Sequence, residues 1–205
     1  MTRAIPLALA TLLALTYPAA ALTLGDPMPA TNLPLLATDG RPLTLGQLTG
    51  NRGTLVLFTC VHCPFVAAWQ DRMATLGNTY AERGIGVVFI NPNDPARIPL
   101  DAVGPMRRQA RDHGYRFPYV VDTTSDVARA FDARHTPEAY LFDGAGHLAY
   151  HGAIDDNSHD PAAVRHHYLR DALEAVIAGH RPPVTEAPAL GCALQLRPPS
   201  SAKPR

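Results

Sequence analysis

Two cysteines separated by two residues carry the chemistry that this sequence suggests most directly. Cys60 and Cys63 enclose His62 in the run Cys-Val-His-Cys, which follows the apolar segment 54–59 and precedes Pro64. A thiol at the entry to a helix faces free backbone N–H groups and the positive end of the helix dipole, which lower its pKa. We therefore predict that Cys60 is an acidic, accessible, attacking sulfur. Cys63, one turn into the helix, is predicted to be the resolving sulfur.

His62 strengthens this prediction because an imidazolium beside a thiolate adds a second positive charge. Stabilising the reduced form makes a cysteine couple more oxidising. The third cysteine, Cys192, lies in a proline-rich segment. Two readings of it stay open: a free exposed thiol, or an auxiliary resolving cysteine that folds back to the pair. Because the segment shows no apolar pattern that would dock it, we predict that Cys192 is dispensable for redox turnover.

The elements that position the motif follow the order β-α-β, helix, β-β, helix. Segment 54–59 predicts a strand buried on both faces, and a helix follows from Pro64 towards Gly84. Segment 86–90 predicts the next strand, parallel to the first. The other expected elements are a hairpin over 32–45, a helix over 105–113, a strand over 118–121, a helix over 126–131, a hairpin of 138–143 with 147–151, and a final helix from Asp160-Pro161 to Gly179.

Length and composition indicate a single domain with an added segment at each end. The 205 residues carry 18 basic and 18 acidic side chains, and this balance gives no reason to expect nucleic acid or a membrane surface as a partner. Residues 1–21 read as a signal peptide: Arg3 is followed by an apolar run and by small residues for cleavage before Leu22. Residues 22–180 form the predicted domain, and 181–205 a proline-rich tail without a core of its own. The expected location is periplasmic or secreted, with no membrane span after cleavage.

The motif at residues 60–64, the β-α-β unit around it, and Thr136-Pro137 before a hairpin resemble the thioredoxin-like superfamily. The resemblance covers residues 24–179. The N-terminal hairpin and the loop after Ile90 are similar to the exported redoxin branch, whose architecture resembles that of the alkyl hydroperoxide reductase/thiol-specific antioxidant group. The resemblance implies an α/β fold with a central mixed sheet, flanking helices and an added N-terminal β-hairpin. It also implies a cis-proline, Pro137, that faces the cysteines and helps to bind substrate backbone.

The function implied by the resemblance is thiol–disulfide exchange by an exported oxidoreductase, with Cys60 as nucleophile and Cys63 as resolving residue. His62, Pro64, Thr136 and Pro137 would support the pair. The redox-active disulfide would replace any cofactor, and no metal is expected. Partners would be protein thiols or disulfides and an upstream redox protein.

The tryptophan that usually precedes the first cysteine is Thr59 here, and the first strand lacks the usual buried acid, so the proton relay is missing or replaced. Glu138 is a weak candidate for that role; the simpler reading is an ordinary strand residue.

Two other functions of the same fold stay open. A copper-carrying branch binds metal through two cysteines and one distant histidine, which would be Cys60, Cys63 and His135 here. That branch spaces its cysteines one residue further apart and lacks the cis-proline.

Peroxidases of the peroxiredoxin type place proline seven residues and threonine or serine three residues before the attacking cysteine. The corresponding residues here do not fit: Gly53 and Leu57 for the first cysteine, Val56 and Cys60 for the second.

Overall fold

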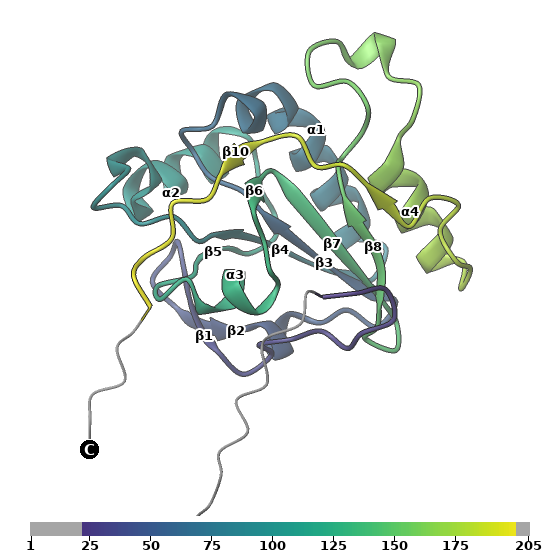
Figure 1. Ribbon diagram of the computed structural model, residues 1–205, viewed down its shortest axis with the longest axis horizontal. Helices are drawn as coiled ribbons and strands as arrows, with labels where there is room; N and C mark the ends of the chain where they lie inside the picture. The colour runs from purple at the N-terminus through teal and green to yellow at the C-terminus, as the bar shows by residue number, and fades with distance from the viewer. Residues whose placement is uncertain (1–21, 200–205) are drawn as a thin grey trace, which may run out of the picture.

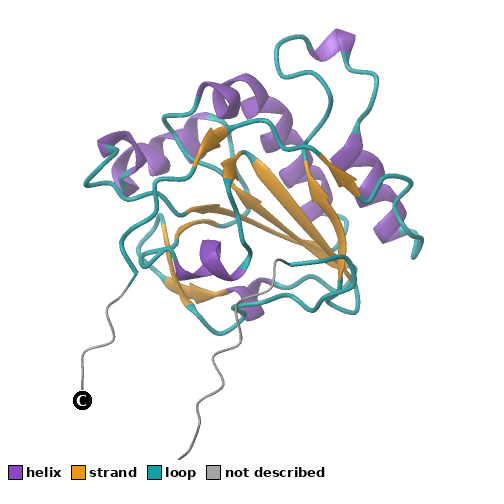
Figure 2. Cartoon of the chain, viewed as in Figure 1, coloured by secondary structure: helices purple, strands orange, loops and turns teal. Residues whose placement is uncertain are grey.

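A mixed sheet forms the centre of the protein in the computed structural model, which describes residues 22–199. The predicted signal peptide therefore lies outside the described residues. The sheet has eight strands in the order β2-β1-β5-β4-β3-β7-β8-β9, and a second sheet pairs β10 with β6 (Figures 1 and 2). The strands are β1 Pro34–Ala37, β2 Pro42–Thr44, β3 Gly53–Phe58, β4 Ile85–Asn91, β5 Tyr119–Val121, β6 His135–Thr136, β7 Glu138–Asp143, β8 Leu148–Gly152, β9 Glu186–Ala187 and β10 Cys192–Ala193.

The predicted β-α-β unit is present at the middle of the large sheet. β3 and β4 are parallel, and every residue of β3 is buried, as its continuous apolar sequence predicts. Between them runs α1, Pro64–Ala81, with Pro64 in its first turn. The helix ends before Gly84, whose φ of +91° is a conformation that glycine adopts without strain.

Helices and apolar side chains cover both faces of the sheet. One core joins α1 to α4, Tyr168–Ile177, and to Met106 of α2, Val103–Asp112. The other core, on the opposite face of β3 and β4, includes α3, Asp126–Ala130, and Leu45 of the short helix η1, Leu45–Leu48. Two further single-turn helices are η2, Pro99–Asp101, and η3, Pro161–Ala163. The α/β fold with a central mixed sheet, flanking helices and an N-terminal hairpin is thus confirmed.

Two predictions about the elements of the fold are wrong. The last helix begins at Tyr168 and not at Asp160. Asp160 does act as a cap, because its carboxylate accepts a hydrogen bond from the Ala162 amide, but the turn it starts is only η3. The second error is the expectation that the proline-rich tail does not dock: between residues 186 and 197 it forms β9 and β10 and packs on the domain. Within residues 22–199, no helix combines the length and the apolar character needed to cross a membrane.

Candidate active site

The CxxC motif lies where β3 passes into α1. Cys60 follows the strand after one residue, and Cys63 is the residue that precedes the first turn of α1. Both sulfur-bearing side chains are fully buried, with exposed fractions of 0%. The sequence predicted this position correctly. The motif stands between a segment with the pattern of a buried strand and a helix that begins at a proline, so it has to lie where the strand meets the helix.

The peptide bond between Thr136 and Pro137 is cis, as the resemblance implied, and Thr136 touches both sulfurs. Its hydroxyl oxygen lies 3.1 Å from Cys60 Sγ, and its carbonyl oxygen lies 3.1 Å from Cys63 Sγ. These contacts bring together the two cysteines and β6, although 73 or more residues separate them in the chain. The predicted site residues Cys60, Cys63, Thr136 and Pro137 therefore form one site.

The tail adds a residue that sequence reasoning had set aside. Cys192 is joined to Cys63 in a disulfide with a Cα–Cα distance of 6.0 Å, and Cys60 is the free thiol. Of the two readings left open by the sequence, the fold-back is the one observed, and the expectation that the tail would not dock is wrong. Single-sequence patterns miss this because the strand that holds Cys192 is two residues long.

Cys60 is not the accessible, acidic thiol that the helix-entry argument predicts. Burial raises its pKa to about 12, and the negative charge of Asp101 acts in the same direction. The hydrogen bond with Thr136 and the backbone N–H groups of Cys63 and His62 act to lower the pKa. The helix terminus thus acts to lower the pKa of Cys60, but burial raises this pKa by more.

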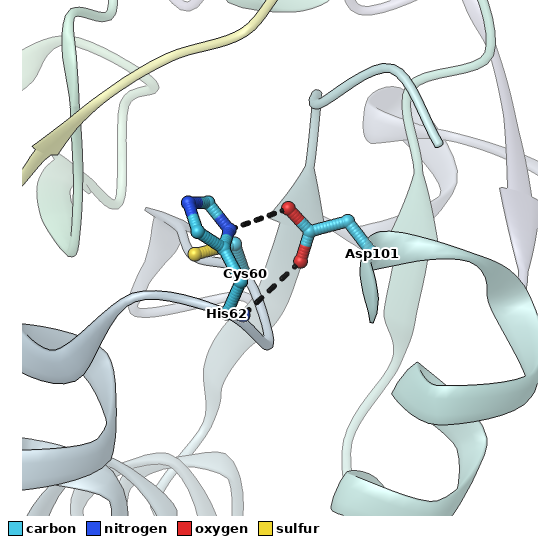
Figure 3. A group of neighbouring side chains, drawn as sticks. All are labelled: Cys60, His62 and Asp101. Carbon is cyan, nitrogen blue, oxygen red and sulfur yellow. Dashed lines mark hydrogen bonds and ion pairs between the residues drawn. The ribbon is translucent and has the colours of Figure 1, made fainter. Parts of the chain in front are cut away.

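His62 and Asp101 form a polar pair beside Cys60 (Figure 3). His62 Nδ1 lies 2.8 Å from one carboxylate oxygen of Asp101, and the other oxygen accepts a hydrogen bond of 2.7 Å from the Val61 amide. The Asp101 side chain is fully buried, whereas that of His62 keeps 24% of its surface exposed. Asp101 therefore orients His62 and fixes the loop between the two cysteines.

Asp101 is a residue of this site that the sequence analysis missed. Asn93 donates a further hydrogen bond of 2.8 Å to its carboxylate, so the loop after β4 supplies both the acid and its partner. The first strand lacks the acid expected for a thioredoxin-like protein, and Asp101 brings a buried carboxylate to the cysteines from another element. The available signal was weak: a single acidic residue at the end of a proline-rich loop.

Glu138 shapes the turn before the cis-proline. Its carboxylate accepts hydrogen bonds from the backbone amides of Arg134 and His135, and it lies 2.8 Å from His151 Nε2. Burial acts to raise its pKa, but these hydrogen bonds outweigh burial and hold the pKa below its usual value. Glu138 thus supports the segment that carries Thr136, and it contacts neither cysteine in the hydrogen-bond network.

The metal ligands considered for the alternative function are not assembled here. Among residues 22–199, one group of three potential ligand atoms lies within 4.8 Å of one another, and it consists of Cys60, His62 and Asp101. It does not include His135, which pairs through its backbone with Ala193, and the sulfur of Cys63 is bonded to Cys192.

Fold and site together define a thioredoxin-like protein with a CxxC motif opposite a cis-proline. The sequence matches the model of the AhpC/TSA family over residues 24–151, and the chain belongs to this family. It is 34% identical to an uncharacterized conserved protein from Geobacillus kaustophilus, whose crystal structure superposes with a TM-score of 0.80 over 86% of this chain and 94% of that one. A hypothetical protein from Sinorhizobium meliloti is 31% identical, with a TM-score of 0.78 over 87% and 97% of the two chains.

Among curated proteins, the chain is similar to a protein from Halalkalibacterium halodurans named thiol-disulfide oxidoreductase ResA. The two are 26% identical over 119 residues, which is 58% of this chain. The alignment spans 63% of that relative, which is less than two thirds of its length.

Proposed function

We propose that this protein is an exported thiol–disulfide oxidoreductase that exchanges disulfides through Cys60 and Cys63. The observation that carries the proposal is the placement of both sulfurs 3.1 Å from atoms of Thr136, next to the cis peptide bond. A disulfide already joins Cys63 to a third cysteine, so this site holds the bond that exchange chemistry makes and breaks. The curated relative named as a thiol-disulfide oxidoreductase supports the same reading.

Cys60 is the nucleophile in this proposal. Its thiolate attacks one sulfur of a substrate disulfide, a mixed disulfide forms, and one substrate thiolate leaves. Cys63 then attacks Cys60, releases the second substrate thiolate and forms the Cys60–Cys63 disulfide. Two electrons pass from the cysteine pair to the substrate, and an upstream thiol protein returns them. Because Cys60 is buried and Cys63 is bonded to Cys192, the site has to open and that disulfide has to be broken before this cycle can start on a protein substrate.

The sequence of residues 1–21, which has the pattern of a signal peptide, supports the proposal of export. An oxidising compartment lets disulfides persist, in agreement with three cysteines that are placed to form and exchange them. Protein thiols and disulfides outside the cytoplasm are the substrates we infer.

Trapping of mixed disulfides tests the proposal. Cys63→Ser removes the resolving sulfur, so Cys60 should remain bonded to partner proteins, visible as bands on non-reducing gels that disappear on reduction. Cys60→Ser is the matched control and should trap no such partners. Purified wild-type protein should also accelerate the reduction of insulin by dithiothreitol, whereas Cys60→Ser should not. Absence of both trapping and acceleration would refute the assignment.

Peroxide consumption separates exchange from the peroxidase function known in related architectures. The residues before Cys60 lack the proline and threonine pattern of peroxiredoxins, so we expect little peroxide consumption by the reduced protein. Rapid, Cys60-dependent consumption of hydrogen peroxide would replace our proposal with a peroxidase.

A further inference from the structure

The C-terminal tail crosses the end of the sheet that carries the two cysteines. In Figure 1 it runs from the side of α4, past β6, towards α2. There β10 pairs with β6 in antiparallel register, with Cys192 opposite Thr136 and Ala193 opposite His135. The tail therefore lies as an added strand on the segment that ends in the cis Thr136–Pro137 peptide, where an extended substrate backbone would pair.

The fit between the tail and this strand is close at Gly191. A Cβ built on Gly191 would lie 2.3 Å from the carbonyl oxygen of Thr136 and 2.7 Å from its carbonyl carbon. These are backbone atoms next to the cis bond, so they have little freedom to move aside. Only glycine allows the tail to approach β6 this closely, and a larger residue would lift the strand off.

Polar contacts anchor the tail beyond Cys192. The Leu194 amide donates a hydrogen bond to the Arg134 carbonyl oxygen at 3.1 Å. The Gln195 amide donates to the side-chain oxygen of Asn93 at 2.8 Å, and the Gln195 carbonyl oxygen accepts from the Asp94 amide at 2.8 Å. Because the side-chain nitrogen of Asn93 donates to Asp101, the docked tail is connected directly to the carboxylate beside Cys60.

Arg197 completes the docking, and apolar contacts add to it. The guanidinium group of Arg197 donates to the carbonyl oxygen of Asp122 at 2.8 Å, and its amide donates to the hydroxyl oxygen of Ser125 at 3.1 Å. Leu194 and Leu196 are half-buried against the core that includes α3. The tail is thus a built element of the fold, with specific partners from several segments.

We propose that Cys192 is a third redox-active cysteine, which exchanges disulfides with the Cys60–Cys63 pair. The tail then occupies the position beside β6 where an extended substrate strand would pair. This inference rests on the exchange function proposed above. It assigns Cys192 a place in the reaction and makes the tail a competitor of external protein substrates for β6.

The internal step balances without any external oxidant. The Cys60 thiolate attacks Cys63 Sγ, the bond between Cys63 and Cys192 breaks, and the bond between Cys60 and Cys63 forms. Cys192 leaves as a thiolate and takes up a proton, while Cys60 has given one up. No net oxidation occurs, and the disulfide moves from the tail to the active pair. Attack by Cys192 on Cys63 reverses the step. Thr136, in contact with both Cys60 and Cys63, holds the reacting sulfurs at one place.

Native alkylation without any added thiol tests the internal step. Oxidised wild-type protein is incubated with iodoacetamide, and trypsin then yields peptide 53–72, which holds both Cys60 and Cys63. It also yields peptide 171–205, which holds Cys192, because Arg181, Arg197 and Lys203 each precede a proline. Internal exchange frees Cys192 transiently, so the cross-link between the peptides should give way to alkylated Cys192 and a disulfide within 53–72.

Cys60→Ser is the matched control for this step. It keeps the cross-link but lacks the attacking sulfur, so its Cys192 should stay unmodified over the same period. In wild type, conversion should accelerate about tenfold for each pH unit, because the reactive thiolate is scarce below its pKa. Alkylation of Cys60 with an intact cross-link, or equal modification of Cys192 in both proteins, would overturn the proposal.

A second pair of variants tests whether the tail occupies the position beside β6, without changing a cysteine. Gly191→Ala should lift the tail, and Cys60 of the reduced chain should then alkylate at least about tenfold faster than in wild type, since its thiolate fraction increases when it becomes solvated. Leu190→Ala, at an exposed neighbouring residue, should react like wild type. Equal alkylation rates of Cys60 in the two variants would show that the tail does not occupy this position. If internal exchange occurs but neither wild type nor Gly191→Ala accelerates insulin reduction, exchange with external proteins fails, and with it the competition for β6, while the internal step between Cys192 and the Cys60–Cys63 pair is retained.

Discussion

Asp101 and His62 are 39 residues apart in the sequence, yet His62 Nδ1 lies 2.8 Å from the buried carboxylate of Asp101. This contact joins the loop after β4 to the loop between the two active-site cysteines. A carboxylate thus stands beside Cys60 even though β3 supplies none. Its partners are the backbone of Val61, the imidazole of His62 and the amide of Asn93.

Asp101→Asn should lower the pKa of Cys60 and destabilise the protein. The negative charge of Asp101 contributes to the raised pKa of Cys60, so neutralising it makes the thiolate easier to form. Loss of the charged acceptor should cost about 1–3 kcal/mol of unfolding free energy. Alkylation rate against pH and denaturant unfolding measure the two effects. Asp71→Asn is the control, since Asp71 contacts His113 but is 92% exposed, and it should change neither quantity appreciably. An unchanged Cys60 titration in Asp101→Asn would contradict this account.

Thr136→Val should raise the pKa of Cys60 further. The hydrogen bond with the Thr136 hydroxyl lowers that pKa, and valine has nearly the same shape without the hydroxyl. A lost hydrogen bond of about 1 kcal/mol corresponds to about a fivefold lower thiolate population at a given pH. The alkylation rate of the reduced chain at pH 9 should decrease accordingly. Thr136→Ser keeps the hydroxyl and should retain the wild-type rate; equal slowing in both variants would assign the effect to packing.

Glu138→Gln should lower the free energy of unfolding, and the decrease should be largest near neutral pH. The folded-state pKa of Glu138 is lowered, so its ionised form contributes stability above its unfolded pKa, about 4.3, and that contribution is lost as the pH falls through the folded value. The difference in unfolding free energy between wild type and variant should therefore shrink on acidification. Glu186→Gln changes an exposed residue of β9 and serves as the control. A difference that stays constant between pH 7 and pH 3 would contradict the linkage.

Cys60 should make the oxidised protein sensitive to alkali. Its folded pKa of about 12 exceeds the unfolded value of about 8.5, so the buried thiol contributes stability that is fully present below pH 8.5 and is lost as the pH rises through the folded pKa. Over this interval, the loss should approach about 1.4 kcal/mol per pH unit. Cys60→Ala should show a shallower decline in unfolding free energy. Both proteins share the buried tyrosines, so the difference isolates the thiol; parallel declines would show that Cys60 is not buried as described.

The sequence by itself determined the elements around the motif and their approximate order. The apolar run of β3, Pro64 at the start of α1 and the turn residues of the hairpins are local signals, because each depends on the spacing of neighbouring residues. They located Cys60, Cys63 and Pro137 correctly, and the resemblance to thioredoxin-like proteins implied the cis bond that the structure contains. The last helix was placed too early because a sound cap at Asp160 starts only a single turn.

Tertiary structure alone decided the environment of the cysteines. The pKa of an isolated helix-entry thiol is lowered by nearby N–H groups, but the pKa of Cys60 is raised by burial in the folded chain, where Thr136 contacts its sulfur from 76 residues further along. Asp101 reaches the site through long-range packing, and Cys192 reaches it because Gly191 lets two backbones approach closely. Such contacts depend on chain segments that the fold brings together, and no local periodicity in the sequence encodes them.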